Sequence, residues 1–476
     1  MMSADSTATS LSTEHGTRTG LFRTCFPSFP VLILAILVCV VAPISLISIH
    51  VHENPRFSPI DEAVQYDYVN RVAGGSVPRL GQLLLPASVH VISCRGVAAN
   101  GPPLKCPGTG KPDTYPGGPY QYEAQQPPTY YAATVPLRWL GVHVFGMDGV
   151  TAARTTGGLW VATALLLLWM TGRMLGLPVR KIVPPILLLA SAPTVVYQSS
   201  IVSNDAPALF AGALVAFLGI LAWKRPGRWT FPTLFVGGVL VTSFKLDDAL
   251  CVVVVAGVLG IVGWSEVRSQ SSETVPKWGT WLSNWTPTGG ALVLGCTACA
   301  VGWIIANREL SLINPKTLSS FAALRTGPVG LTLIARESLS MLNPLAGSYA
   351  PFRTNAIGTP AGTFDSLNLQ PITATLTEYL FLAVGLTGIF VTPRRWPHWL
   401  GLLSLLVLYV GGIVLGFGVW HTYSADPSVG GRYGLCVAPL LALALASIVR
   451  SWGAVVGLWV FSIATVGLTY FYLLAA

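Results

Sequence analysis

The chain has 476 residues, of which 52% are hydrophobic and only 10% are charged. Soluble domains carry about 25% charged residues, so this composition excludes an ordinary soluble protein and indicates a polytopic membrane protein. The net charge of +9 does not indicate a nucleic-acid partner, because the basic residues are spread through short segments between apolar runs, where they set membrane topology.

Apolar runs long enough to cross a hydrocarbon core of roughly 30 Å recur along the chain. The first, "FPVLILAILVCVVAPISLISI" at 29–49, is too long for a typical cleaved signal sequence, so we expect a retained span. Residues 1–28, rich in Ser and Thr, are expected to form a disordered cytoplasmic tail. Further runs lie at about 150–171, 182–200, 205–223, 230–244, 249–264, 288–306, 376–392, 398–419, 434–449 and 454–474. The predicted fold is an all-α bundle of about eleven transmembrane helices within residues 29–476.

The basic residues also predict the orientation of the bundle. Loops such as "GRMLGLPVRK" and "WKRPGRW" belong to a set that holds eleven basic residues, whereas the alternating short loops hold two, Lys245 and Arg432. Because basic loops stay in the cytoplasm, we expect a multi-pass protein of the plasma (inner) membrane with its amino terminus inside. The long segments 50–149 and 307–375 then form outer loops, and their aromatic and apolar content favours order over flexible linkers.

The first outer loop contains two local features. "DEAVQYDYVNRVAGG" can form a short amphipathic helix, with Ala63, Tyr66, Val69, Val72 and Ala73 roughly on one face. Cys94 and Cys106 lie outside the apolar runs, and the oxidising side of a membrane permits a disulfide between them. Two free thiols are the alternative.

Acidic side chains gather at the predicted outer ends of spans. A carboxylate in hydrocarbon costs about 2.5–3.5 kcal/mol, so each acid there needs water, a partner or a function. Asp205 in "SIVSNDAPALF" could contribute to a site or merely cap the next helix. Glu123 could likewise contribute to a site, or it could be a solvated loop residue. The full set is Asp61, Glu62, Asp67, Glu123, Asp205, Asp247, Asp248 and Asp426.

Three cations are candidates for binding an anion. Lys245 in "FKLDDAL" either pairs with a neighbouring aspartate or meets an anionic ligand. Arg432 in "GGRYGLCVAP" can hold a phosphate in a bidentate fork, or it can snorkel to the interface. Arg353 in "YAPFRTNAIG" is the third.

The phrase "YQYEAQQPPTYYAA" is the most distinctive in the chain. Pro127 and Pro128 impose an extended or turn geometry and halt any helix. Tyr130 and Tyr131 begin the following segment, where aromatics also suit the membrane interface.

The order of these features resembles the GT-C superfamily of membrane glycosyltransferases. The features are the acid pair Asp61–Glu62 after the first span, then "YEAQQPPTYY", "SND", and "GRY" at the outer end of a late span. The neighbourhood includes protein O-mannosyltransferases, the lipid A aminoarabinose transferase and bacterial cell-envelope glycosyltransferases. The resemblance implies a GT-C-like fold over about residues 30–450 and a lipid-linked sugar donor, commonly a polyprenyl-phosphate monosaccharide, used on the outer face.

The resemblance aligns Asp61 with the catalytic base, Glu123 with the acid of the second loop motif and Arg432 with the phosphate contact. Glu62 joins Asp61 as a catalytic candidate, and Lys245 and Arg353 join Arg432 as phosphate-binding cations. Aromatic and polar side chains are expected to line the sugar or acceptor: Tyr66, Tyr122, Gln125, Gln126, Tyr130, Asn204, Asp205 and Tyr433.

The expected function is an inverting glycosyltransferase that moves a sugar from polyprenyl phosphate to an envelope glycan, lipid or protein. Its partners are the donor, the acceptor and the bilayer, without nucleic acid, and we expect a monomer. The Ala/Gly/Val-rich composition is compatible with a high-GC genome such as that of actinobacteria, which use mannose and arabinose donors. No cluster has metal-ligand spacing, although a divalent cation stays open as a cofactor. A secondary transporter or flippase for a lipid-linked or anionic substrate is the alternative, which broken helices and charges near span midpoints would favour.

Overall fold

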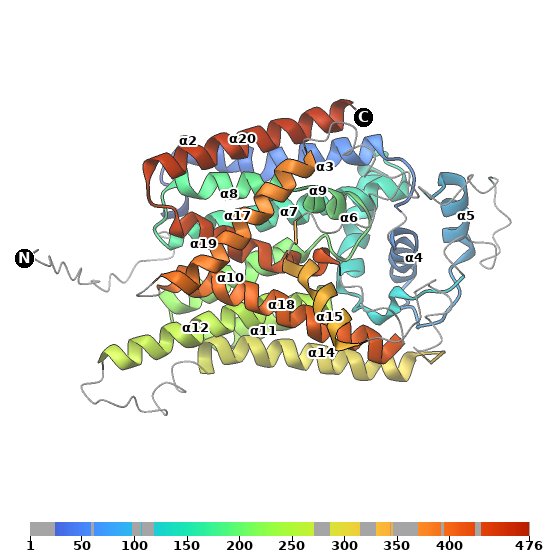
Figure 1. The fold of residues 1–476 in the computed structure, drawn as a ribbon. Helices are drawn as coiled ribbons and strands as arrows, with labels where there is room; N and C mark the ends of the chain where they lie inside the picture. Colours follow the sequence, from blue (N-terminus) through green and yellow to red (C-terminus); the bar gives the residue numbers. More distant parts are fainter. Residues whose placement is uncertain are drawn as a thin grey trace, which may run out of the picture.

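The computed structural model describes residues 24–58, 61–97, 106, 119–270, 286–314, 330–342, 344–345, 370–391, 395–423 and 430–475. Within these ranges the chain forms a bundle of helices (Figure 1) without a named strand, and its β-structure is limited to two isolated bridges, Phe57 with Val97 and Leu83 with Tyr120. Arg353, Asp426, residues 1–23 of the predicted tail and most of the predicted loop 307–375 lie outside the described residues.

The eleven predicted spans all correspond to helices. The first is α2 (Phe29–Ile36) and α3 (Ala42–Glu53), joined by a π-helical segment, Leu37–Val41. The others are α7 (Gly149–Met174), the pair α8 (Val179–Ser191) and α9 (Pro193–Ser200), α10 (Ala208–Lys224), α11 (Thr230–Phe244), α12 (Ala249–Gln270), α14 (Ala291–Leu310), α17 (Gln370–Phe390), α18 (Trp396–Tyr423), α19 (Ala438–Ile448) and α20 (Trp452–Ala475). In the described part of the chain, seven stretches are long and apolar enough to cross a membrane. The pair α8–α9 adds one broken span, and α10, α11 and Tyr379–Phe390 are shorter apolar helices.

The break between α8 and α9 follows directly from the sequence. Pro193 has no N–H to continue the helix, and the residue before a proline avoids helical geometry. Ala192 is accordingly extended, with φ −63° and ψ 129°. The two halves meet at 56°, and this bend brings the chain after α9 toward the end of the bundle where the polar residues gather.

Three helices of the first predicted outer loop lie together at one end of the bundle (Figure 1): α4 (Glu62–Ala73), α5 (Pro86–Arg95) and α6 (Thr129–Phe145). The expectation that α4 has one apolar face was wrong. Glu62, Gln65, Asp67 and Arg71 are buried along with its apolar residues, while Ala73 is exposed. Because α5, α6 and the short 3₁₀ helix Glu123–Gln125 pack against α4, polar side chains on its other faces are enclosed as well.

Glycines allow two close helix contacts that position the same end of the bundle. A Cβ on Gly157 of α7 would lie 1.8 Å from the carbonyl oxygen of Ser199 in α9, and a Cβ on Gly212 of α10 would lie 1.9 Å from that of Cys436. Any side chain at either position would force the backbones apart. These contacts hold α9 and the 3₁₀ segment Gly431–Val437 against the central helices α7 and α10.

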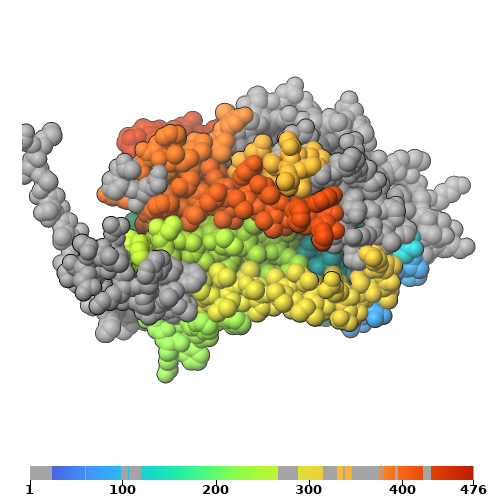
Figure 2. Space-filling view, turned by 60° about the horizontal axis from the view of Figure 1, so that its bottom comes forward, coloured from blue at the N-terminus to red at the C-terminus, as the bar shows by residue number. Residues whose placement is uncertain are grey.

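The remaining helices complete the bundle. Figure 2 shows α14 and α18 on one face, flanking the green helices of the middle of the chain. α11 packs on α14, and α18 packs on α12, α17 and the short helix α15 (Leu331–Ser338). At the amino-terminal end, Cys25 is fully buried and its carbonyl accepts a hydrogen bond from Trp169 Nε1 at 3.2 Å, so the packed chain begins before the predicted boundary at residue 28.

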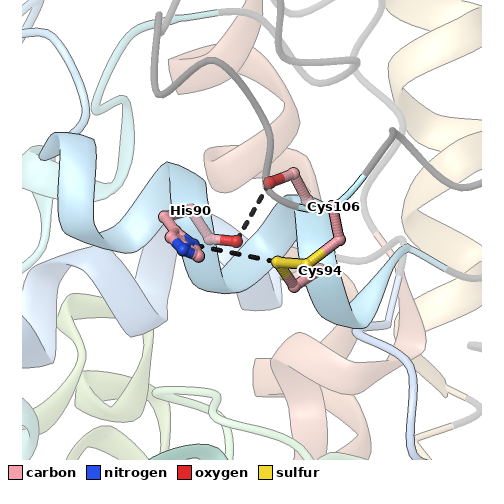
Figure 3. Close-up of a disulfide and its surroundings, with 4 residues drawn as sticks. His90, Cys94 and Cys106 are labelled. Atoms are coloured by element: carbon pink, nitrogen blue, oxygen red, sulfur yellow. Dashed lines mark hydrogen bonds between the residues drawn. A yellow bond between two sulfur atoms is a disulfide. The ribbon is translucent and has the colours of Figure 1, made fainter.

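The two cysteines of the first predicted outer loop are joined by a disulfide. Cys94, at the end of α5, is bonded to Cys106, twelve positions later. Figure 3 shows His90 one turn earlier on the same helix, with Nδ1 3.8 Å from Cys94 Sγ.

Candidate functional site

Charged residues from four distant parts of the chain meet at the end of the bundle that carries α4 and α6. Asp61 precedes α4, Asp205 follows α9, Lys245 follows α11 and Arg432 precedes α19. Arg432 Nη2 donates to Asp61 Oδ2 at 3.0 Å, and Arg432 Nε lies 3.6 Å from Asp205 Oδ2. Lys245 Nζ donates to the other oxygen of Asp205 at 2.5 Å. We call these four residues the charged cluster.

Asp61 has an unusual backbone conformation. Its φ of 57° and ψ of −8° place it in the left-handed region, and it is the one non-glycine residue with positive φ in the described ranges. Aspartate tolerates this region better than most residues, and such strained positions are concentrated at functional sites. The Asp61 carboxylate accepts from Tyr122 OH at 3.0 Å as well as from Arg432.

Asp205 links the two cations from a buried position. Burial alone would raise the pKa of Asp205, but Lys245 and Arg432 outweigh it and hold that pKa below its ordinary value. Burial would likewise lower the pKa of Lys245, but Asp205 and Asp247 raise it. Asp205 does not cap the next helix, because Pro207 is the N-cap residue of α10 and no side chain caps that end. Asp205 and Lys245 are therefore both charged inside the cluster.

Tyr433 lies against both cations of the cluster. Lys245 Nζ is 4.1 Å from the centre of its ring, and the guanidinium carbon of Arg432 is 5.2 Å away. Arg432 Nη2 also lies 3.4 Å from Tyr433 OH. Lys245 is further paired with Asp247, whose Oδ2 lies 3.4 Å from Nζ. One aromatic ring and three carboxylates, Asp61, Asp205 and Asp247, thus surround two cations.

Glu123 lies beside the cluster at the start of the 3₁₀ helix Glu123–Gln125. Burial raises its pKa to about 8, reinforced by the nearby Asp61 carboxylate and opposed by Lys245 and Arg432. Among the described residues none donates a hydrogen bond to its carboxylate, and its backbone N–H donates to Gln121 Oε1 at 3.1 Å. Glu123 is therefore largely protonated at neutral pH, which limits repulsion between it and Asp61.

Glu62, which the sequence pairs with Asp61, has a different environment. Its carboxylate is fully buried and accepts from Arg154 Nε at 2.6 Å and Nη2 at 2.7 Å. The backbone N–H groups of Ser58 and Val202 donate to the same carboxylate at 2.6 Å and 2.9 Å. Because all of these interactions are internal to the protein, Glu62 holds the start of α4 against α7 and is not available to a substrate.

The segment after α9 is fixed by side chains from α4 and α6. Three successive N–H groups each have a side-chain acceptor: Val202 N donates to Glu62 at 2.9 Å, Ser203 N to Tyr130 OH at 3.1 Å, and Asn204 N to Gln65 Oε1 at 2.7 Å. Asp205 N donates to Ser203 Oγ at 3.1 Å. These bonds determine where Asp205 lies, and with it the cations it contacts.

Several other side chains proposed for the sugar or acceptor have structural partners. Tyr66 OH accepts from Arg138 Nη2 at 3.2 Å, and Tyr130 supports Ser203 as described. Gln126 Oε1 accepts from Leu246 N at 3.5 Å, whereas Trp303 Nε1 donates to the backbone carbonyl of Gln125, at 2.7 Å, and not to its side chain. Of the predicted set, Asp205 belongs to the charged cluster, and Tyr122 and Tyr433 contact it directly.

Sequence reasoning did not identify the polar residues that support the cluster. Arg154 could have been noticed, because a lone arginine in an apolar run requires an internal partner. Gln65 had no signal of its own. Asp67, by contrast, was among the candidate acids. Its carboxylate accepts from Arg71 Nε at 2.7 Å, Gln121 Nε2 at 3.1 Å and Leu85 N at 2.8 Å, and of these partners only Arg71 was indicated by i,i+4 spacing in the sequence.

The described residues contain no group of three or more His, Cys, Asp or Glu side chains that could hold a metal ion.

Comparisons with known proteins yield one structural likeness. No protein-family model and no curated protein matches the chain. The chain is similar to a solved structure, ArnT from Cupriavidus metallidurans bound to undecaprenyl phosphate. That likeness has a TM-score of 0.44 and 15% sequence identity, and it covers 90% of this chain and 63% of the ArnT chain. The protein thus spans less than two thirds of the length of the ArnT chain.

Proposed function

We propose that the protein is an inverting membrane glycosyltransferase that moves a sugar from a polyprenyl-phosphate donor to an envelope glycan, lipid or protein acceptor. The observation that carries the proposal is the 3.0 Å contact between Asp61 and Arg432. A candidate base and a candidate phosphate ligand, far apart in the sequence, share one cluster at the end of a helical bundle. The order of sequence motifs that resembles GT-C enzymes supports the same assignment.

The two cations suit the leaving group of such a reaction. Polyprenyl phosphate already carries negative charge, so it can depart without an acid, but the charge that develops on it must be stabilised. Arg432 and Lys245 converge on Asp205 Oδ2 and Oδ1, at 3.6 Å and 2.5 Å. A carboxylate is a smaller anion than a phosphate, and its position between the cations indicates where a phosphate oxygen would be attracted.

Asp61 is the proposed general base, and its exposure supports this role. Its side chain is 27% exposed, compared with 3% for Asp205, so an acceptor hydroxyl can approach it from outside the packed bundle. In the proposed step the hydroxyl proton goes to Asp61, the acceptor oxygen bonds to the anomeric carbon, and the bond from that carbon to the phosphate oxygen breaks. The electron pair leaves with polyprenyl phosphate. One displacement of this kind inverts the anomeric configuration.

Arg432 connects the two halves of this mechanism. With Asp61 as its partner, part of the positive charge of Arg432 is neutralised and the carboxylate is held by a charge-assisted hydrogen bond. A bound phosphate competes for the guanidinium, which loosens its bond to Asp61. We infer that donor binding frees the base, so that the donor binds before the acceptor reacts.

The outer face of the plasma membrane is the proposed site of the reaction. Lys224 and Arg225 lie at the end of α10, opposite to the end that follows Asp205, and they belong to the strongly basic set of loops. Because such loops favour the cytoplasm, the charged cluster is assigned to the other side.

A secondary transporter or flippase for a lipid-linked or anionic substrate is the second candidate. The observation that favours it is the 56° break between α8 and α9, since broken helices are typical of transporters. The charged residues described above lie at helix ends, however, which favours the transferase.

The deciding experiment uses the purified full-length protein in detergent with labelled polyprenyl-phosphate mannose and polyprenyl-phosphate arabinose, and envelope material from a strain that lacks the protein. Wild type should transfer one of these sugars. Asp61→Asn should reduce transfer by about 10²- to 10⁴-fold, the contribution of a general base, while polyprenyl phosphate still binds. Asp148→Asn, at an exposed ion pair, is the control. Full activity of Asp61→Asn would refute the base, and binding without transfer by wild type would favour the transporter.

A further inference from the structure

Two buried amide groups near Asp205 have no hydrogen-bond partner for their nitrogen atoms among the residues that the structure describes. They are Nε2 of Gln198, in α9, and Nδ2 of Asn204, in the segment that follows α9. Both residues are at most 2% exposed. Leaving a buried donor unsatisfied costs about 1–3 kcal/mol. Two such donors in one short segment therefore indicate that a ligand supplies their acceptors.

Backbone N–H groups in the same segment do have partners, which sets these two nitrogens apart. The N–H groups of Val202, Ser203 and Asn204 all have side-chain acceptors. The Gln198 amide is itself anchored through its oxygen, which accepts from Ser203 Oγ at 3.3 Å. Its orientation is therefore determined by the protein, and its nitrogen is left as a fixed donor.

The chemistry around these nitrogens identifies the class of ligand. Ser203 Oγ lies 3.3 Å from Gln198 Oε1 and 3.5 Å from Asp205 Oδ2, so the Asp205 carboxylate, an acceptor, is linked through Ser203 to the Gln198 amide. A hydroxyl group both donates and accepts, and it satisfies such a mixed set. A cation would leave the amide nitrogens unpaired, and an anion has no hydrogen to donate to the oxygen atoms of Ser203 and Asp205. A ring that bears several hydroxyl groups fits both kinds of partner.

We propose that Gln198 and Asn204 form a subsite that binds hydroxyl groups of the sugar on the polyprenyl-phosphate donor. The proposal rests on the proposed function. The donor is favoured over the acceptor because both amides are fully enclosed beside Asp205 and Lys245, the buried half of the charged cluster, whereas Asp61 on the acceptor side is partly exposed.

The test compares two lipids that differ only in the sugar. The probes are polyprenyl phosphate without a sugar, and polyprenyl-phosphate mannose or arabinose, whichever the wild type binds. Equilibrium binding is measured for the purified full-length protein with Gln198→Met and with Asn204→Leu, which keep side-chain size but remove the amide. Trp160→Phe is a matched control, because it removes another unpartnered N–H, which lies among Phe210 and Phe244.

Each amide variant should weaken binding of the sugar-bearing lipid by about 3- to 10-fold, the effect of one neutral hydrogen bond. Binding of the sugar-free lipid should not change, which also shows that the variant is folded. Equal effects on both lipids, or on neither, would overturn the subsite. A raised KM for the acceptor with unchanged donor binding would overturn its assignment to the donor. If wild type bound neither lipid, the proposed function itself would fail.

Discussion

Arg432 Nη2 lies 3.0 Å from Asp61 Oδ2, although 371 positions separate the two residues in the sequence. The same arginine lies 3.6 Å from Asp205 through Nε. Its guanidinium therefore joins the partly exposed carboxylate to the buried one. A ligand that pulls Arg432 toward itself must alter the environment of both acids.

Replacing Arg432 should weaken binding of the lipid phosphate. Arg432→Gln removes a charge-assisted contact of about 1.5–3 kcal/mol, which corresponds to roughly 10- to 150-fold in the Kd for polyprenyl phosphate. Arg228→Gln is the matched control, because Arg228 is exposed beside Trp229, in the loop before α11. Binding of polyprenyl phosphate by Arg432→Gln at wild-type strength would remove this residue from the phosphate site.

Asp61→Asn should bind polyprenyl phosphate more tightly than wild type, even though its transfer of sugar is strongly reduced. The substitution removes the negative charge that partly neutralises Arg432. The pair is partly exposed, so the gain is that of a surface ion pair, about 0.2–1 kcal/mol or up to roughly 5-fold in Kd. Titration of both proteins with polyprenyl phosphate at low and high salt measures it. Weaker binding by Asp61→Asn would contradict competition between Asp61 and phosphate for Arg432.

The stability of the protein should depend on pH through Glu123. Burial and the Asp61 carboxylate raise its pKa from 4.5 to about 8. The folded state therefore keeps this proton to a higher pH than the unfolded chain. The resulting stability is fully present below about pH 4.5 and is lost as the pH rises through about 8. Thermal unfolding in detergent should show a decline of wild type toward alkaline pH that is weaker in Glu123→Gln. Identical profiles would show that Glu123 does not hold this proton.

Glu62→Gln should impair folding, not catalysis alone. It leaves the buried guanidinium of Arg154 without its counter-ion, and breaking one partner of a buried pair costs about 3–5 kcal/mol. The midpoint of thermal unfolding and the yield of folded protein are the measurements. Asp148→Asn is the control, because its pair with Arg95 is exposed and worth about 0–1 kcal/mol, and asparagine can still cap α7. A stable but inactive Glu62→Gln would restore the catalytic hypothesis for Glu62.

The spans could be predicted because each depends on one local property, a long apolar run. The break at Ala192 was also visible in principle, since Pro193 follows it. Burial on every side of α4 was not, because it depends on α5, α6 and residues near 123 that pack around it. The periodicity of apolar residues predicts only a helix that packs against one surface. It cannot predict that three other elements enclose the helix.

The neighbouring acids show where the sequence becomes insufficient for the site. Asp61 and Glu62 read alike in the chain, yet the left-handed backbone of Asp61 accompanies a carboxylate that meets Arg432, while Glu62 meets Arg154. The partner of each is set by tertiary packing. For the same reason Tyr66 and Tyr130, chosen as sugar contacts by residue type, have Arg138 and Ser203 as their partners.

The bonds from Glu62, Gln65 and Tyr130 to three consecutive amides after α9 limit how this architecture can be recombined. The acceptors belong to the loop-derived helices, whereas the donors continue a membrane helix. A chimaera that exchanges the segment carrying α4 and α6 for a foreign one would leave the amides of Val202, Ser203 and Asn204 without acceptors, and Asp205 would no longer be held in its position beside Lys245. The two parts are thus a single cooperative unit, and positions 62, 65 and 130 must be inherited together with 202–205.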